Sequence, residues 1–383
     1  MDPINASENN QSNSGKKARP QFNFPTDYKS ILNRLQNVDP IKYARTRNFT
    51  DGDVTYLSPY ISRGVISLNQ IKEHVLKTHQ PYQIEKFLQE LAWREYWQRV
   101  WQSMGDEIFT DIKQQQPDVT HRKMVAALEN ADTGIDAIDE HIEKLYATGY
   151  MHNHMRMYVS SIACNNAKAH WLQPSQWLYY HLLDGDLASN SLSWQWVAAS
   201  FSSKKYYCNQ ENINRYANSN QQHSFLDQSY ETIAEMRIPE VLLEKTNFFP
   251  ATNLPEKTTP ELQKNLPVLV YNSYNLDPIW HAGEAANRIV LLEPAHFKKY
   301  PVSDKVIQFI TDLSKNIEGV QIFSGSFDEL KMAAGTSKIY YKSHPTSRHY
   351  QGIAEKYDEL VPQVSGYFSS FSGYWKKCAK YLG

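Results

Sequence analysis

The sequence predicts two structural parts, an all-helical part followed by a smaller α/β part, and two observations support this fold class. Between about residues 27 and 235, apolar residues recur every three or four positions and β-branched runs are scarce, which is typical of helices. Beyond residue 266, short apolar runs alternate with an amphipathic segment, which is typical of strands covered by helices. We therefore expect a multi-domain protein of the α and α/β classes.

Composition shifts along the chain predict where these parts begin and end. Residues 1–20 are rich in Asn, Ser and Lys without apolar periodicity, which predicts a disordered tail. We assign residues 21–240 to the helical domain. Residues 241–265 are rich in Pro, Thr and Asn and are interpreted as a linker. Residues 266–383 form the expected α/β domain.

Within the α/β part, four short apolar runs are expected to be strands of a largely parallel sheet: 266–271, 287–293, 319–325 and 337–343. The run SDKVIQFITDLSKNI lies between the second and third and is expected to be a helix. Strands that alternate with helices indicate a small Rossmann-like α/β domain.

Composition and charge limit the class of protein. Of the 383 residues, 41% are hydrophobic, which excludes global disorder. The balance of 40 basic against 41 acidic residues disfavours a histone-like wrapper, although a local basic groove can still attract nucleic acid. Three cysteines are too few for a disulfide scaffold and fit a reducing compartment. No apolar run approaches the ~20 residues of a membrane helix, so we expect a cytoplasmic protein without a membrane partner.

Aromatic residues are unusually frequent, with 25 Tyr, 15 Phe and 9 Trp. Core packing explains such numbers in many proteins. A planar ligand, stacked bases or an electron-transfer route are the alternatives.

One helix face combines residue types that do not suit a plain core. In KFLQELAWREYWQRVW, helical spacing places Glu90, Trp93, Arg94 and Trp97 on the same face. A carboxylate, a guanidinium and two indoles on one face predict a lined pocket.

Two further segments contain candidate ligand-binding residues. TYLSPYISRGVIS, residues 55–67, is a hydroxyl-rich turn before a helix, which can either cap the helix or hold phosphate oxygens. In MHNHMRMYVSS, Asn153, Arg156 and Met157 project together. His152 and His154 point in different directions and lack further ligands, so a metal site is not favoured.

The segment LLDGDLASNSLSWQW places Asp184 and Asp186 around a glycine, before an Asn190 and Trp194 pair at i and i+4. The acids resemble a fragment of a calcium loop, but the other ligands of an EF-hand are missing. A buried Asp184 needs a partner, and Arg156 is the obvious one. An ion pair, an amide and an indole together suit a polar aromatic cofactor.

Four motifs, LSPYISRGVIS, ELAWREYW, TGYMHNHMRM and LLDGDLASNSLSWQW, in this order and spacing resemble the flavin-binding domain of the cryptochrome/photolyase family. The resemblance covers roughly residues 28–235 and implies a helical domain around a U-shaped FAD. It also implies the FAD contacts, with Asn190 facing the flavin N5: Tyr43, Thr55, Tyr56, Leu57, Ser58, Arg94, Asn153, Arg156, Asp184, Asp186 and Asn190.

By the same resemblance, the substrate is UV-damaged DNA carrying a cyclobutane pyrimidine dimer, and light drives electron transfer from FAD to it. Glu90, Trp93 and Met157 match residues that meet the flipped-out dimer. Trp194 and Trp171 match the first members of an electron-transfer chain. Trp171 follows Met157 by 14 residues, a spacing of about four helical turns. The third member is expected near residues 115–119, where the sequence has no Trp; Trp101 or a tyrosine is the alternative.

The sequence departs from the family in two places. Residues 202–222 replace the family segment that borders DNA and flavin, although Lys204, Lys205 and Arg215 can either meet phosphates or lie on a solvated surface. The family's α/β antenna domain, expected at the N-terminus, is missing there, and the C-terminal part resembles it instead, with residues 338–360 as its later strand and helix. The antenna pigment and the oligomeric state stay open. A deoxyribodipyrimidine photolyase is the first expectation; a cryptochrome-like photoreceptor and a flavin-free binding module are the alternatives.

Overall fold

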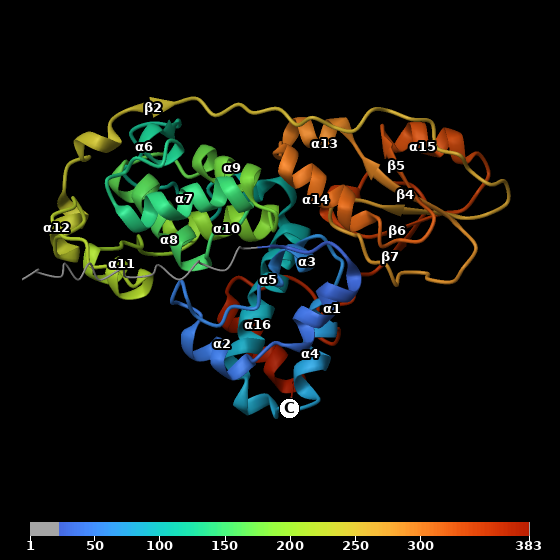
Figure 1. Cartoon of the computed structure of the whole chain (residues 1–383), viewed down its shortest axis with the longest axis horizontal. Helices are drawn as coiled ribbons and strands as arrows, with labels where there is room; N and C mark the ends of the chain where they lie inside the picture. Colours follow the sequence, from blue (N-terminus) through green and yellow to red (C-terminus); the bar gives the residue numbers. More distant parts are fainter. Residues whose placement is uncertain (1–22, 383) are drawn as a thin grey trace, which may run out of the picture.

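The computed structural model describes residues 23–382, so the tail expected over residues 1–20 lies outside the described residues. The first part of the chain is helical (Figure 1). Its α-helices are α1 (Tyr28–Gln36), α2 (Pro40–Thr46), α3 (Ser58–Ser62), α4 (Leu68–Leu76), α5 (Glu85–Met104), α6 (Ala126–Glu129), α7 (Asp136–Thr148), α8 (Asn153–Ser161), α9 (Leu172–His181), α10 (Leu187–Val197), α11 (Gln210–Ala217) and α12 (Tyr230–Glu235).

Helix α5 is the centre of this part. It is 20 residues long and packs against α2 and α10, while α10 also packs against α8 and α9. A short ribbon of β1 (Met124–Val125) and β2 (Lys245–Thr246) pairs a segment before α6 with the chain leaving α12. After β2, residues 247–265 carry no regular structure and lead toward the sheet.

The C-terminal part contains a five-stranded parallel sheet in the order β5-β4-β3-β6-β7. Its strands and helices are β3 (Val268–Tyr271), β4 (Asn287–Leu292), α13 (Pro294–Lys299), α14 (Asp304–Ser314), β5 (Val320–Ser324), α15 (Phe327–Ala334), β6 (Ile339–Lys342), β7 (Ile353–Glu355) and α16 (Phe371–Cys378). The four expected strands and the expected helix are therefore confirmed, and the parallel sheet with them.

The expected helix after β6 is wrong, because residues 353–355 pair with β6 as a fifth strand. Gly352 allows this approach: a Cβ there would lie 2.5 Å from the carbonyl oxygen of Ile339. Any other residue would push this edge of the sheet apart.

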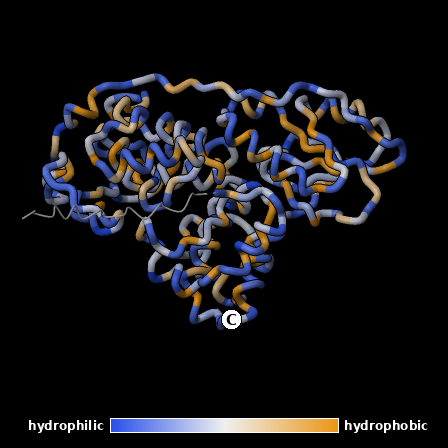
Figure 2. Tube along the Cα trace, in the orientation of Figure 1, coloured by the Kyte–Doolittle hydropathy of each residue, from blue (hydrophilic) through white to orange (hydrophobic). Residues whose placement is uncertain are grey.

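Alternating residues of the strands bury both faces of the sheet. Val270 and Ile289 belong to a small core with Phe327 of α15. Tyr271 and Val290 point to the other side and belong to the main core. Figure 2 shows the hydrophobic residues concentrated along these strands.

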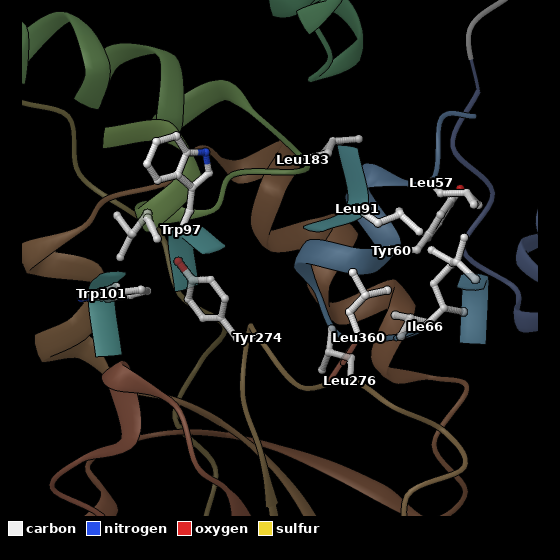
Figure 3. Close-up of a cluster of buried hydrophobic side chains, with 14 of the residues drawn as sticks. Leu57, Tyr60, Ile66, Leu91, Trp97, Trp101, Leu183, Tyr274, Leu276 and Leu360 are labelled. Carbon is white, nitrogen blue, oxygen red and sulfur yellow. The ribbon is translucent and has the colours of Figure 1, made fainter. Parts of the chain in front are cut away.

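One hydrophobic core joins the sheet to the helical part (Figure 3). Trp97 and Trp101 of α5 belong to it, together with Tyr274 and Leu276 from the loop after β3. Polar contacts reinforce the junction: Lys305 of α14 donates hydrogen bonds to the carbonyl oxygens of Tyr146 and Ala147. The two parts therefore share a buried interface.

The C-terminal helix leaves the sheet and packs against α5 (Figure 1). Tyr374 and Cys378 on its inner side are fully buried. Helix α16 is thus part of the surroundings of α5, although it follows the α/β segment in sequence. None of the described helices is both long and apolar enough to span a membrane.

Candidate functional site

Helix α5 presents its mixed face as expected. Glu90, Trp93 and Arg94 are half-buried, whereas Trp97 is 7% exposed and belongs to the main core. The first three residues therefore lie at the edge of the core, and the ring of Trp97 packs against that of Trp93.

The expected partner of Asp184 is present. One guanidinium nitrogen of Arg156 on α8 lies 2.9 Å from each carboxylate oxygen of Asp184. Burial alone would raise the pKa of Asp184. The charge and hydrogen bonds of Arg156 and the hydroxyl of Ser58 lower it by more than burial raises it, so the pKa of Asp184 lies below its usual value. Asp184 is therefore a buried, ionised carboxylate.

One serine, Ser62, connects this ion pair to α5. The hydroxyl of Ser62 donates to the carbonyl oxygen of Asp184 over 2.9 Å and accepts a hydrogen bond from Arg94 over 2.6 Å. The structure thus brings Ser58, Arg94, Arg156 and Asp184 together. Ser62 was missed in the sequence, although it lies one helical turn after Ser58 in the same motif.

Tyr150 is a second residue that sequence reasoning missed. Its ring lies 5.5 Å from the ring of Tyr56 and 5.6 Å from the guanidinium of Arg156. Burial raises the pKa of Tyr150, so its hydroxyl stays protonated. It joins the turn before α3 to α8. Its position directly before the MHNHMRM motif was the available signal.

The turn before α3 has the strained backbone that a binding turn often shows. Tyr56 adopts a left-handed conformation with φ of 51°, and its carbonyl oxygen accepts a hydrogen bond from Arg34. The hydroxyl of Thr55 accepts from the backbone N–H of Leu57. Tyr43 lies nearby on α2, edge-on to Phe87.

Helix α10 carries the remaining candidates. Asp186 caps it by accepting from the backbone N–H of Ser189 and also accepts from Gln98. Asn190 is half-buried and donates to the carbonyl oxygen of Ser175. Asn153, by contrast, is exposed at the first position of α8, and no contact in the structure joins it to the Arg156 set.

Unpartnered buried atoms test whether these residues suit a polar aromatic cofactor. The hydroxyl of Ser189 and the indole N–H of Trp194 are buried without a hydrogen-bond partner among the described residues. Both are on α10 and flank Asn190 in sequence. Unpaired buried polar atoms are costly, so the donor set fits a polar ligand that completes it.

Comparison with known proteins identifies the family. Residues 87–290, more than half of the chain, match the model of the FAD-binding domain of DNA photolyase. This chain belongs to the photolyase FAD-binding family. FAD is the cofactor of that domain, in agreement with the donor set on α5, α8 and α10.

Relatives carry photolyase and cryptochrome names. A deoxyribodipyrimidine photo-lyase of Synechococcus is 32% identical over 41% of this chain and 35% of its own length. The cryptochrome DASH of Danio rerio is 31% identical over 41% of this chain and 32% of its own length. The crystal structure of a Synechocystis cryptochrome aligns with 23% identity and a TM-score of 0.46, over 51% of this chain and 46% of that one. The chain spans about a third of the length of these curated relatives.

Two of the candidate substrate residues of this photolyase-family chain, Glu90 and Trp93, already have partners within the protein. The carboxylate of Glu90 lies 2.9 Å from the ammonium of Lys86 and 3.4 Å from the guanidinium of Arg47. The indole of Trp93 is stacked on the ring of Phe371. Met157, on α8, is half-buried. Phe371 could not be found by sequence reasoning, because it lies 278 positions after Trp93 in the chain.

The two candidate electron-transfer tryptophans lie in a separate core cluster of this photolyase domain. Trp171 is fully buried, and its indole N–H donates to Asp111 over 2.7 Å. Met157 and Trp171 are not separated by four turns of one continuous helix, as the spacing predicted, because α8 ends at Ser161 and a π-helical turn follows before α9. Gln115, Gln116 and Val119, near the expected third member, line a cavity of about 590 Å³ with Asp111 and His170.

The segment that departs from the family pattern contains α11. Lys205 is 12% exposed and pairs with Asp118 at 2.6 Å, whereas Lys204 and Arg215 are exposed. The two exposed cations are the ones available to phosphates. Within residues 23–382, no cluster of three or more His, Cys, Asp or Glu side chains is arranged to hold a metal ion.

Proposed function

We propose that the chain is a deoxyribodipyrimidine photolyase-like lyase that binds FAD and repairs cyclobutane pyrimidine dimers in blue light. The observation that carries the proposal is that α5 bears both a residue assigned to the cofactor and residues assigned to the substrate. Arg94 on this helix is linked through Ser62 to Asp184, on the cofactor side, whereas Glu90 and Trp93 lie one turn earlier or less. One rigid helix therefore fixes the distance between the cofactor residues and the substrate residues.

The residues assigned to FAD have complementary roles. Arg156 and Arg94 supply positive charge, the Thr55–Ser58 turn supplies hydroxyls and amides, and Asp186 orders the start of α10. The full proposed set is Tyr43, Thr55, Tyr56, Leu57, Ser58, Arg94, Asn153, Arg156, Asp184, Asp186 and Asn190. When bound, reduced FAD supplies an electron on excitation by blue light.

The residues around the flavin ring suit an electron-rich cofactor. Asn190 is an amide, so it can hydrogen-bond the ring without adding the negative charge that a carboxylate would bring. The Arg156 guanidinium, held by Asp184, keeps a positive charge beside it. Trp171 and Trp194 are proposed as a buried route for electrons, since both indoles are enclosed by the core.

The substrate residues recognise and stabilise the lesion. Trp93 offers a ring face for a flipped base, and Met157 gives an adaptable apolar contact. Glu90 accepts hydrogen bonds from a base edge, and its ion pairs with Arg47 and Lys86 hold the carboxylate in position. Bond breaking requires no proton transfer from these side chains, so their contribution is positioning and electrostatic stabilisation.

The α/β part is proposed to be a Rossmann-like, antenna-like domain placed at the C-terminus. Taken in chain order, its strands follow the sequence 3-2-1-4-5 across the sheet, the order of the doubly wound nucleotide-binding fold. The boundaries proposed for the helical domain, linker and α/β domain are 21–240, 241–265 and 266–383. A cytoplasmic location stays a prediction from the cysteine content.

A cryptochrome-like photoreceptor that binds FAD without repairing DNA is the second candidate, favoured by the covered ring of Trp93. Titration with two oligonucleotides, identical except for one thymine dimer, separates the candidates. A photolyase prefers the dimer-containing strand by at least tenfold. Equal affinity for the two strands, in protein that carries FAD, supports the photoreceptor.

A further inference from the structure

The indole of Trp93 and the phenyl ring of Phe371 form a parallel stack. Their ring centroids are 3.7 Å apart and their planes differ by 9°. Both side chains are half-buried. Trp93 comes from the middle of α5, whereas Phe371 is the first residue of α16.

Helix α16 is anchored below this stack by a buried polar network. The Tyr374 hydroxyl donates to the carboxylate of Glu95 over 2.6 Å, and the backbone N–H of Leu360 donates to its other oxygen. Arg99 pairs with the same carboxylate at 3.0 Å. Glu95, Arg99 and Tyr374 are all buried. The helix is therefore fixed, and the stack lies at its first turn.

Phe371 is held less firmly than the residues below it. Its other ring contacts are edge-on to Tyr96 at 5.9 Å, tilted to Tyr374 at 6.4 Å and parallel to Trp375 at 6.4 Å. All three are longer than the contact with Trp93. The neighbouring Ser372 and Gly373 are exposed. Rotation of the side chain toward solvent can thus uncover Trp93 without undocking α16.

We propose that Phe371 is a place-holding ring that occupies the base-stacking face of Trp93 and leaves when the substrate base enters. This inference rests on the proposed function. Stacked carbon atoms approach to about 3.5–4.0 Å, so rings 3.7 Å apart leave no room for a base between them. Base and Phe371 therefore compete for one face, and Phe371 sets how tightly a lesion binds.

If Phe371 competes with the substrate base, its removal should increase the affinity for dimer-containing DNA. A protein whose binding-competent state is a fraction of the population binds more weakly by that fraction. Phe371→Ala removes the competitor and is expected to tighten binding of a dimer-containing oligonucleotide about 3- to 10-fold. Phe371→Leu keeps apolar volume but stacks poorly, so it is expected to fall between the wild type and Phe371→Ala.

The matched control is Phe368→Ala, on the same segment. Phe368 is half-buried against Tyr374, 5.4 Å between ring centroids, and its ring has no contact with Trp93. Binding by this variant is expected to equal that of the wild type. Unchanged or weaker binding by both Phe371 variants, with melting temperatures close to that of the wild type, would overturn the proposal.

A direct measurement of where the Phe371 ring lies tests the place-holding role separately from the proposed repair function. In full-length protein with 4-fluorophenylalanine at position 371, the fluorine resonance is shifted by the indole ring current, and the dimer-containing oligonucleotide is expected to move it to the solvent-exposed position. An unmoved resonance in a complex that prefers the dimer overturns the place-holder and leaves the repair function standing. If neither the wild type nor Phe371→Ala prefers the dimer, the proposed function fails and the place-holder with it.

Discussion

Arg156 and Asp184 join helix α8 to the loop before α10 through a single guanidinium nitrogen that lies 2.9 Å from both carboxylate oxygens. The side chain of Asp184 is 3% exposed and that of Arg156 is 20% exposed. Asp184 is thus the more deeply buried partner, and its negative charge is balanced by the guanidinium of Arg156.

Arg156→Leu is expected to destabilise the fold by about 3 kcal/mol, because it leaves the buried Asp184 carboxylate without its cation. Urea denaturation measures this loss. Arg215→Leu, at an exposed site on α11, serves as the control and is expected to change stability by less than about 0.5 kcal/mol. A loss below about 1 kcal/mol for Arg156→Leu would show that the ion pair is dispensable to folding.

His152 makes stability depend on pH. Burial, and secondarily the positive charges around it, lower its pKa from 6.5 to about 3. Below pH 6.5 the unfolded chain binds a proton that the folded chain excludes, so the stability present above pH 6.5 is lost as the pH falls toward 3. Between pH 6.5 and 5 this one group is expected to cost roughly 2 kcal/mol.

His152→Asn tests that assignment. The Nδ1 atom of His152 accepts from the backbone N–H of His154 at the start of α8, and an Asn oxygen can replace this cap. The variant is expected to lose less stability than the wild type between pH 6.5 and 5, measured by urea denaturation. Parallel losses in the two proteins would assign the acid sensitivity to other groups.

Tyr374→Phe removes one oxygen atom from the network that anchors α16. The hydroxyl donates to the buried Glu95 carboxylate, so its loss is expected to cost about 1–3 kcal/mol. Hydrogen exchange across residues 359–378 is expected to accelerate. Tyr367→Phe, with Tyr367 46% exposed, is the matched control and is expected to leave both measurements unchanged.

Glu90→Ala and Trp93→Ala are expected to weaken dimer repair at least tenfold while FAD remains bound, because both side chains are proposed to contact the dimer and neither belongs to the proposed FAD set. The flavin absorbance of the purified variants measures cofactor content, and loss of dimers in light measures repair. Full repair by both variants would place the substrate elsewhere on the molecule.

The sequence was informative where the determinants are local. The period of apolar residues predicted the four strands and α14, and i, i+3 and i+4 spacing predicted the shared face of Glu90, Trp93 and Arg94. The pairing of Arg156 with Asp184 also followed from residue chemistry, since a buried acid requires a cation.

Long-range contacts were beyond such reasoning. Nothing near Trp93 in sequence indicates that Phe371 stacks on it, because that contact depends on how the C-terminal segment returns to α5. Residues 353–355 form a strand because they pair with the edge of β6. In a segment of three residues, this pairing outweighs the local preference of the sequence for a helix. The π-helical turn after α8 likewise interrupted a spacing that assumed one continuous helix.

Light-dependent repair is the decisive experiment for the proposed photolyase function. Protein carrying chemically reduced FAD is mixed with an oligonucleotide that contains one thymine dimer and is held either in blue light or in darkness. We expect the dimer to disappear in light and to persist in the dark. A dimer that survives illumination, in protein whose flavin content and reduction are verified by absorbance, would contradict the photolyase function.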